Sequence, residues 1–364
     1  MRTSDFDYDL PPELIAQTPI EPRDASRLLV VNRATRELAH RHFHDIGDYL
    51  RPGDLLVANR SRVIPARLAG RKADTGGAVE VLLLARRTDL GPEYWEALVR
   101  PGRRIREGQE LRFERGATAV EGEAALSASV VARTEAGGRI LRFMPPASDE
   151  PLDAVLAQLG TVPLPPYIRA PLANPERYQT VYSREPGSAA APTAGLHFTP
   201  ELLARLAAQG VETVYVLLHV GLDTFRPVEE EDPRDHKMHS EAFELNEQAA
   251  EQINAARARG GRVIAVGTTS VRVLESLPDA AQVEPAQGRT TLFITPGYRF
   301  RLVDALITNF HLPRSSLLML VSAFAETPGA GSHGAGIDLM RRAYAEAIAR
   351  RYRFFSFGDA MLIL

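Results

Sequence analysis

The stretch between Ala66 and Pro146 constrains the fold most, because it contains five strand-like runs and no pattern typical of a helix. The runs are rich in β-branched and aromatic residues, and glycine pairs such as Gly76-Gly77 and Gly137-Gly138 separate them. Short strands joined by tight turns are typical of a small antiparallel barrel. We therefore predict an inserted β-barrel domain over residues 66–149, with the strands VEVLLLAR, YWEALVR, ELRFER, LSASVVAR and RILRFM.

The segments on either side differ, because helical patterns alternate there with short apolar runs. Thr199 is a typical N-cap ahead of Pro200, and the helix ELLARLAAQ that follows ends at Gly210. Asn246 caps a second helix, expected to extend to Arg259 and followed by the strand RVIAV. This alternation predicts one discontinuous, layered α/β main domain from residues 1–65 and 150–364. Its other expected elements are the strands RLLVVNR, DLLVANR and Phe354–Leu364 and the helices Leu152–Leu159, Ser316–Phe324 and Ile337–Arg351.

The run GSAAAPTAGLHF, from Gly187 to Phe198, has the composition of a binding site. Its alanines and glycines leave the backbone open to the close approach of a ligand. His197 is its only titratable group, with an ordinary pKa near neutrality. A tight strand-to-helix connection is the structural alternative, but it explains only Thr199 and Pro200. We therefore expect His197 to take part in function.

Three further polar clusters each follow an apolar, strand-like run. They are HVGLDTFRPV (219–228), VGTTSVRVLE (266–275) and TNFHLPRSSLLMLVSAFA (308–325). Open α/β sheets bind their ligands at the carboxyl ends of their strands, so we expect these clusters to converge. The free N–H groups and hydroxyls of residues 267–270 should form an anion site at a helix start.

The composition excludes several kinds of chemistry. Without cysteine, the chain has no thiolate nucleophile, no thiolate zinc site and no cysteine-ligated iron–sulfur cluster. All but two of the 43 basic residues are arginine, which leaves Lys72 and Lys237 as the candidates for a Schiff base. The N-terminal segment lacks the apolar run of a signal peptide, and the longest apolar stretch, LLMLVSAFA, is too short to cross a membrane. We therefore expect a cytoplasmic protein that is not bound to a membrane.

The net charge of −3 argues against a generic nucleic-acid binder, although arginines gather locally. The guanidinium group matches phosphate oxygens, so these clusters could contact RNA. Solvated loops explain them equally well. The first cluster is Arg60, Arg62, Arg67, Arg71 and Lys72, and the second is Arg100, Arg103, Arg104 and Arg106.

Two groups of histidines have spacings that a metal site could use. The three histidines of residues 40–44 alternate, so a strand would turn them to one face, but no fourth ligand is apparent. His236 and His239 lie three residues apart with Glu241 nearby, and we prefer substrate hydrogen bonding to a salt-bridged loop for them. We therefore expect no metal site.

Taken in order, the motifs of the chain resemble those of the S-adenosylmethionine:tRNA ribosyltransferase-isomerase family of queuosine biosynthesis. The resemblance covers essentially the whole length, and the matches are long, ordered and non-repetitive. They are EPRDASRLLV (21–30), GDLLVANRSRVIPARL (53–68), LPPYIR (164–169), RYQTVY (177–182), AAPTAGLHFT (190–199), HVGLDTFRPV (219–228), HKMHSE (236–241), VGTTSVR (266–272), TNFHLPRSSLLMLVSAF (308–324) and FFSFGDAMLIL (354–364).

The resemblance implies an unusual reaction of S-adenosylmethionine, which would be a consumed co-substrate with no further cofactor. Its ribosyl part would move to the amine of 7-aminomethyl-7-deazaguanine, at the wobble position of a tRNA with a GUN anticodon. Rearrangement to an epoxycyclopentanediol would accompany the release of adenine and methionine. The proton transfers need a base, for which His197, His219 and His311 remain alternatives. We expect a monomer.

The resemblance and the strand-end positions together indicate substrate-binding residues. Residues 267–270 would hold the methionine carboxylate or a tRNA phosphate. Pro313 should keep Arg314 outside the regular helix, where it can contact a charge. The expected set is Tyr167, Arg169, Thr193, Gly195, Phe198, Thr224, Arg226, His236, His239, Glu241, Thr268, Thr269, Ser270, Asn309 and Arg314.

Two other classes of protein remain as alternatives. An S-adenosylmethionine-dependent tRNA methyltransferase would use the same co-substrate, but the glycine-rich loop after a first strand is missing. A non-enzymatic RNA-binding barrel would account for the arginine clusters. It would not explain the small, uncharged residues of the run from Gly187 to Phe198.

Overall fold

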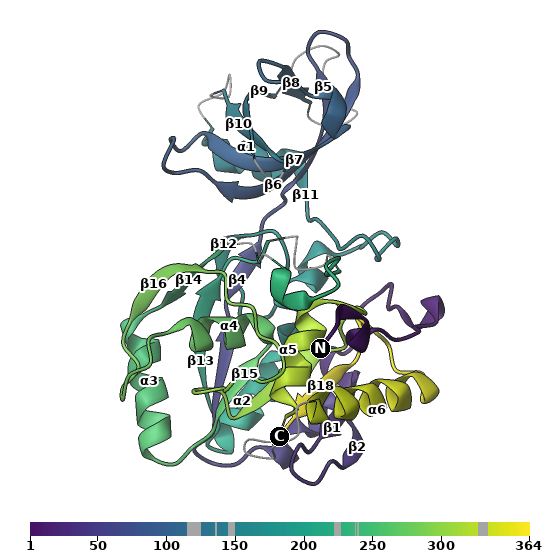
Figure 1. Cartoon of the computed structure of the whole chain (residues 1–364). Coiled ribbons are helices and arrows are strands. Elements are labelled where there is room, and N and C mark those ends of the chain that lie inside the picture. Colours follow the sequence, from purple (N-terminus) through teal and green to yellow (C-terminus); the bar gives the residue numbers. More distant parts are fainter. Residues whose placement is uncertain are drawn as a thin grey trace. The chain divides into compact units, whose positions relative to one another are not determined.

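The structure is a computed structural model that describes residues 1–114, 125–134, 137–144, 150–221, 227–236, 238, 240–326 and 334–364. The chain divides into two compact units, each with its own hydrophobic core (Figure 1). The larger unit is made of residues 1–62, 165–185 and 191–364, and the smaller unit of residues 63–164 and 186–190. The smaller unit is therefore longer than the predicted insertion of residues 66–149.

The smaller unit contains the predicted antiparallel barrel. Six strands form a ring in the order β5-β6-β7-β10-β9-β8, and the pairing of β8 with β5 closes it. Inward-facing residues alternate with outward-facing ones, as in β7, where Trp95, Ala97 and Val99 are buried. The strands are β5 (Arg67–Lys72), β6 (Ala78–Arg86), β7 (Tyr94–Arg100), β8 (Glu110–Phe113), β9 (Leu126–Arg133) and β10 (Arg139–Phe143), with β11 (Gly160–Thr161) beside β5.

Helix α1 (Leu152–Leu159) belongs to the barrel unit and not, as predicted, to the α/β unit. Its residues Val155 and Leu156 are buried in the barrel's hydrophobic core. The sequence pattern indicates the helix and its apolar side. It does not indicate which of the two cores that side covers.

The larger unit is built on a nine-stranded mixed sheet in the order β16-β14-β13-β3-β15-β17-β18-β1-β2. Strands β13, β3, β15 and β17 are parallel, whereas β18 runs antiparallel to β17. The short strands β4 (Ser61–Val63) and β12 (Glu185–Ser188) pair separately. The sheet strands are β1 (Arg27–Val31), β2 (Leu38–His42), β3 (Leu55–Asn59), β13 (Glu212–Leu218), β14 (Glu241–Leu245), β15 (Val263–Val266), β16 (Ala286–Thr290), β17 (Ala305–Asn309) and β18 (Ala360–Ile363).

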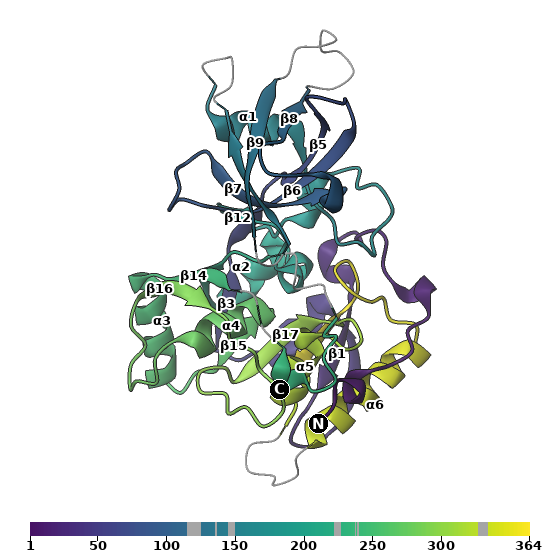
Figure 2. The same ribbon diagram turned by 45° about the horizontal axis from the view of Figure 1, so that its top comes forward.

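Both faces of the central strands are covered, as the nearly continuous apolar sequence of β3 requires. Leu56 and Ala58 lie in one hydrophobic cluster with Leu202 and Leu206 of helix α2. Successive side chains of a strand point to opposite faces, so Val57 faces the other side. Helices and strands of this unit alternate along the chain, as the sequence predicts, and Figure 2 shows them from a second direction.

The helices of the larger unit start where their capping residues predict. Side-chain oxygens of Thr199, Asn246 and Ser315 accept hydrogen bonds from the backbone N–H three residues later. Helix α5 packs against α6 and α4. The α-helices are α2 (Pro200–Ala208), α3 (Glu247–Ala258), α4 (Thr268–Ser276), α5 (Ser316–Phe324) and α6 (Ala335–Ala349).

Short 3-10 helices form much of the connecting chain. One of them, η7, forms within the small-residue run and ends at His197. The others are η1 (Thr3–Phe6), η2 (Pro12–Leu14), η3 (Arg23–Ala25), η4 (Phe43–Tyr49), η5 (Gly102–Arg104), η6 (Pro175–Tyr178) and η9 (Pro233–Asp235), and η7 itself spans Thr193–His197.

The last strand is shorter than predicted. Residues 354–359, expected to belong to it, form a buried irregular segment before β18 begins at Ala360. Phe355 lies in the left-handed region, with φ +69°, which no strand residue adopts. This segment delivers Phe355 and Ser356 to the edge of the sheet.

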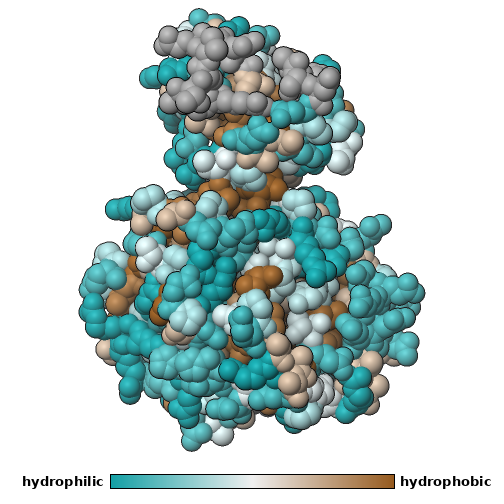
Figure 3. Space-filling view, turned by 180° about the vertical axis from the view of Figure 1, so that it is seen from behind, coloured by the Kyte–Doolittle hydropathy of each residue, from teal (hydrophilic) through white to brown (hydrophobic). Residues whose placement is uncertain are grey.

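The surface is mostly hydrophilic on the face of the larger unit that Figure 3 shows. Among the described residues, the exposed large hydrophobic side chains are Met1, Leu90, Val131 and Val181. None of the described helices combines the length and apolar character that crossing a membrane requires.

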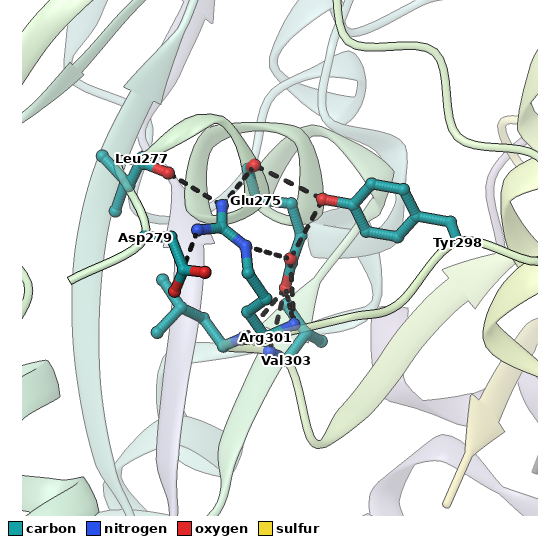
Figure 4. Close-up of polar contacts among 7 residues, drawn as sticks. Glu275, Leu277, Asp279, Tyr298, Arg301 and Val303 are labelled. Carbon is teal, nitrogen blue, oxygen red and sulfur yellow. Dashed lines mark hydrogen bonds and ion pairs between the residues drawn. The ribbon is translucent and has the colours of Figure 1, made fainter. Parts of the chain in front are cut away.

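A buried carboxylate, Glu275 in helix α4, organises the segment that leads into β17 (Figure 4). Its oxygens accept backbone N–H groups of residues 301–303 at 3.0–3.2 Å and the hydroxyl of Tyr298 at 3.3 Å. The Arg301 guanidinium donates to the backbone carbonyls of Glu275 and Leu277 at 2.9 and 2.8 Å. These contacts fix where β17, and therefore its carboxyl end, enters the sheet.

We predict that Glu275→Gln lowers the free energy of unfolding by about 3 kcal/mol, because the amide leaves buried N–H groups and Arg301 without their charged acceptor. Urea unfolding monitored by circular dichroism measures this loss. Asp279→Asn is the matched control, because Asp279 approaches Arg301 at 3.6 Å but is 88% exposed. The control should lose less than about 1 kcal/mol. Equal losses in the two variants would contradict the organising role of Glu275.

Candidate active site

The carboxyl ends of β13, β15 and β17 meet at one edge of the sheet, as their polar clusters predict. Because β18 runs antiparallel to β17, the segment ahead of β18 reaches the same edge. A cavity that opens to solvent lies there, with about 540 Å³ of space between the atoms of its wall and mouth. Its wall comes from residues 191–194, 267–269 and 308–312, together with Tyr167, Val220, Leu317, Phe355 and Ser356.

The side chain of Asn309, at the end of β17, joins three segments of the cavity wall. Its Oδ1 accepts a hydrogen bond from the Thr193 hydroxyl at 2.9 Å. Its Nδ2 donates to the Phe355 carbonyl at 3.3 Å and to His197 Nε2 at 3.2 Å. A carbonyl oxygen only accepts hydrogen bonds, so the Phe355 contact determines the orientation of the amide.

His197 is a buried neutral residue, with 4% of its surface exposed. Its Nε2 accepts from Asn309, so its proton lies on Nδ1, which is 2.7 Å from the Ser26 hydroxyl. Burial lowers the pKa of His197 to about 3, and Arg353 and Arg23 lower it further in the same direction. The ring also stacks on Phe43.

These contacts favour a positioning role for His197. Both of its ring nitrogens make hydrogen bonds within the protein. The His197 side chain lines a second, smaller cavity and not the 540 Å³ cavity. Through Nε2 it fixes Asn309, which does face the larger cavity. Its assignment as the general base therefore stays a prediction that the geometry does not favour.

His311 is the histidine that lines the larger cavity. Its Nε2 lies 2.8 Å from the Thr308 hydroxyl, while no described residue hydrogen-bonds its Nδ1. Its backbone N–H donates to the Tyr344 hydroxyl, and its carbonyl accepts from the Tyr8 hydroxyl. Burial lowers the pKa of His311 to about 3, so the ring is neutral near pH 7. A neutral imidazole with one free nitrogen can donate to or accept from a ligand.

The start of helix α4 forms the next part of the wall. Gly267 has φ +88°, a conformation that favours glycine, and it directs the backbone into the helix. Thr268 and Thr269 both line the cavity, and the buried hydroxyl of Thr269 has no hydrogen-bond partner. Ser270 differs from the prediction, because its hydroxyl donates to the Val266 carbonyl at 3.0 Å inside the core. Two hydroxyls, rather than three, are therefore available to an anion.

Gly195 and Phe198, both expected to bind substrate, lie outside the wall of the cavity. A Cβ on Gly195 would come within 2.0 Å of the Tyr182 hydroxyl oxygen, so tight packing requires this glycine. Phe198 is buried in the core and packs edge-on against Phe43. The small residues of this run therefore serve close packing of η7 as well as access for a ligand.

Tyr167 lines the cavity and Arg169 does not. The Tyr167 hydroxyl is 2.7 Å from the Ser356 hydroxyl, and burial raises the pKa of Tyr167. Arg169 is exposed, and its backbone N–H donates to Gln17 at 2.8 Å.

Glu241, expected to bind substrate, forms a buried ion pair with Arg272 of helix α4. Its other oxygen accepts the Gly221 N–H at 2.9 Å, next to Val220 of the cavity wall. Sequence reasoning missed Arg272, although its place in VGTTSVR, one helical turn beyond Thr268, could have indicated it. This ion pair therefore holds the backbone next to Val220 in place without lining the cavity itself.

The remaining histidines of the predicted set lie at other places. His219 directly follows β13, and its Nδ1 is buried and unpartnered. Burial lowers the pKa of His219 against the opposing effect of Glu185 and Glu244. His236 is 2.9 Å from Glu230. Neither lines the 540 Å³ cavity. Three predicted residues lie outside the described residues, namely Thr224, Arg226 and His239.

Arg314 and the arginines predicted to bind tRNA mostly have partners within the chain. Arg314 pairs with Asp7, and Arg62 bonds both Glu176 and Ser183. Arg60 lies 3.7 Å from Glu185. In the barrel unit, Arg67 has a buried Nε without a partner, Arg71 donates to the Gly76 carbonyl, and Arg103 and Arg104 are exposed.

Only two of the alternating histidines, His40 and His42, lie in a strand, whereas His44 lies in η4. His40 bonds the Tyr352 hydroxyl at 2.8 Å, whereas His42, the last residue of β2, stacks on His44. Within the part of the chain that the structure describes, His42, His44 and Asp45 form the one group with ligand atoms close enough for a metal, and both histidines are exposed. None of these three residues belongs to the wall of the 540 Å³ cavity.

The two buried histidines make stability depend on pH. The pKa values of His197 and His311 are about 3 in the folded protein and about 6.5 in an unfolded chain. Below pH 6.5 the unfolded chain therefore binds protons that the folded protein does not. We expect the free energy of unfolding to fall with pH from about 6.5 downward, by about 1 kcal/mol per pH unit for each histidine.

Urea unfolding at pH 7.5, 6.0 and 5.0 measures this dependence. His311→Gln should make the slope shallower by about 1 kcal/mol per pH unit, the contribution of this one ring, because glutamine does not titrate. An identical pH slope in the wild type and in His311→Gln would contradict the assignment of a buried neutral imidazole.

Comparison with known proteins identifies the family. Residues 3–363 match the family model described as "Queuosine biosynthesis protein". The proteins named S-adenosylmethionine:tRNA ribosyltransferase-isomerase from Symbiobacterium thermophilum and Moorella thermoacetica are 59% and 55% identical, each over 100% of both chains. The crystal structure of S-adenosylmethionine tRNA ribosyltransferase from Thermotoga maritima is 43% identical with a TM-score of 0.54, covering 99% of this chain and 100% of that one. These matches confirm the predicted fold class, and the chain belongs to the queuosine biosynthesis protein family.

Proposed function

We propose that this chain is an S-adenosylmethionine:tRNA ribosyltransferase-isomerase. Its family membership over the whole length supports this activity, and so does the cavity at the carboxyl edge of the sheet. The ribosyl part of S-adenosylmethionine is transferred to the amine of a 7-aminomethyl-7-deazaguanine base in tRNA and is isomerised. Adenine and methionine leave. The observation that carries the proposal is a cavity with hydroxyls at a helix start on one wall and a neutral histidine on another.

The start of helix α4 is the proposed site for the methionine carboxylate. The N–H groups of the first turn and the helix dipole favour an anion there. The unpartnered Thr269 hydroxyl supplies a further donor, since a buried hydroxyl without a partner is costly unless a ligand completes it. Gly267 brings the backbone to the cavity.

His311 is the proposed contact to the reacting groups, through Nδ1. Which hydrogen-bond role it takes depends on the Thr308 hydroxyl: if that hydroxyl donates to Nε2, Nδ1 carries the proton and can donate to departing adenine. In the other tautomer Nδ1 accepts a proton from the attacking amine. His219 and His197 remain the alternative bases.

The sulfonium of S-adenosylmethionine activates its own neighbouring carbon, so the proposed chemistry uses no further cofactor. The proposed RNA substrate is a tRNA with a GUN anticodon. The proposed enzyme is a cytoplasmic monomer. The arginines Arg60, Arg62, Arg67, Arg71, Arg103 and Arg104 are proposed contacts to its phosphates.

We predict that the purified protein, given S-adenosylmethionine and tRNA carrying the 7-aminomethyl base, releases adenine and methionine in equal amounts. Liquid chromatography with mass spectrometry of small molecules and of the digested tRNA measures both products. His311→Asn is the variant control, with adenine release lowered by roughly two to four orders of magnitude. Adenosylhomocysteine, with one added methyl group on the tRNA, would replace this proposal by the methyltransferase alternative.

A further inference from the structure

A second cavity, of about 260 Å³, lies in the larger unit on the other side of His197. Its wall includes two arginines, Arg23 and Arg177, and the backbone of residues 356–358. Ser356 belongs to the walls of both cavities, so an occupant of the second would lie next to an occupant of the first. None of the interactions described above for the reaction uses this second cavity.

Arg23 carries a charge that no carboxylate of the described chain neutralises by direct contact. Its Nη1 donates to the carbonyls of Gln179 and Leu196 at 2.9 and 3.3 Å, and its Nη2 to that of Glu176 at 3.0 Å. Carbonyls satisfy the N–H groups but leave the positive charge of this half-buried side chain, on which Glu21 and Glu176 act only without direct contact. Burial, and then the neighbouring Arg177, lower the pKa of Arg23 to about 10, which shows the unfavourable surroundings of its charge.

Arg177 adds a second, nearly buried charge to the same wall. Its side chain is 14% exposed, and its one carboxylate partner, Glu21, is 68% exposed. Its Nη2 donates to the Ile20 carbonyl at 2.6 Å, while no described residue hydrogen-bonds its Nη1. Arg353 bonds the Thr18 carbonyl and is close enough to lower the pKa of His197, but it does not line this cavity. Two guanidinium groups, those of Arg23 and Arg177, thus line this cavity, and the carboxylate that pairs directly with one of them, Glu21, is exposed to solvent.

We propose that the cavity bordered by Arg23 and Arg177 binds one anionic group, a phosphodiester of the RNA substrate adjacent to the nucleotide that reacts. This inference rests on the proposed function, which places an RNA nucleotide at the neighbouring cavity. A guanidinium pair matches the oxygens of a phosphodiester, and phosphate is the anion that RNA supplies at every nucleotide. The carboxylate of S-adenosylmethionine is the other possible source of a single negative charge, and the experiment separates the two.

Arg177→Gln tests the site, with Arg205→Gln as the matched control because Arg205 is exposed and bonds only the His44 carbonyl. Equilibrium binding of tRNA is measured from about 50 to 200 mM salt without turnover, so the result does not depend on the proposed reaction. Arg177→Gln should weaken tRNA binding about tenfold and make the plot of log affinity against log salt shallower by about one. Calorimetric affinity for S-adenosylmethionine should not change, and Arg177→Lys should restore part of the tRNA affinity.

Glu21→Gln is a second variant in case Arg177→Gln does not fold. Removing this exposed competitor for Arg177 should tighten tRNA binding by about threefold, whereas a purely structural Arg177–Glu21 pair would leave it unchanged. Unaltered tRNA affinity and salt slope in a folded Arg177→Gln protein would overturn the proposal. Weakened S-adenosylmethionine binding with normal tRNA binding would assign the cavity to the carboxylate instead and would overturn the phosphodiester. Failure to release adenine, with these binding results intact, would reject only the proposed reaction.

Discussion

The hydrogen bond from Asn309 to the Phe355 carbonyl determines the arrangement of the site. A backbone carbonyl accepts only from the NH₂ side of the amide, so Oδ1 must face Thr193 and Nδ2 must also face His197. His197 is then forced into the tautomer with its proton on Nδ1, directed at Ser26. One contact therefore couples the end of β17, η7 and the segment before β18. Phe355 makes it from a left-handed backbone conformation, which the surrounding packing has to maintain.

The electrostatics of the site follow from this buried network. His197 and His311 are kept neutral by burial, and the arginines around His197 act in the same direction. Positive charge is concentrated on the far side of His197, at Arg23 and Arg177, while the 540 Å³ cavity is lined by neutral groups. This separation suits a reaction in which a cationic sulfonium and an anionic nucleic acid must occupy neighbouring places. A positive charge in the first cavity would repel the sulfonium.

Local chemistry made some features predictable from the sequence. The N-caps Thr199, Asn246 and Ser315 depend on residues within one turn, and each helix begins where its cap predicts. The convergence of the strand-end segments also follows, because parallel strands must end at one edge. The fold class was predictable for the same reasons.

Contacts between distant residues were not predictable in this way. Ser26 lies 171 residues from His197 in the sequence, so nothing local to the small-residue run indicates that both ring nitrogens are occupied. Ser270 looks equivalent to Thr269, yet its rotamer directs the hydroxyl back to Val266. Gly195 has the composition of a ligand contact but is required by Tyr182.

The protonation of the His197 ring tests this account most directly. Nitrogen-15 NMR of protein with labelled histidine, assigned by comparison with His197→Asn, reports which ring nitrogen carries the proton. The account predicts a proton on Nδ1 and none on Nε2 from pH 8 down to pH 5, with loss of this pattern in Asn309→Ala. A proton on Nε2, or titration of His197 near its ordinary pKa of about 6.5, would contradict it.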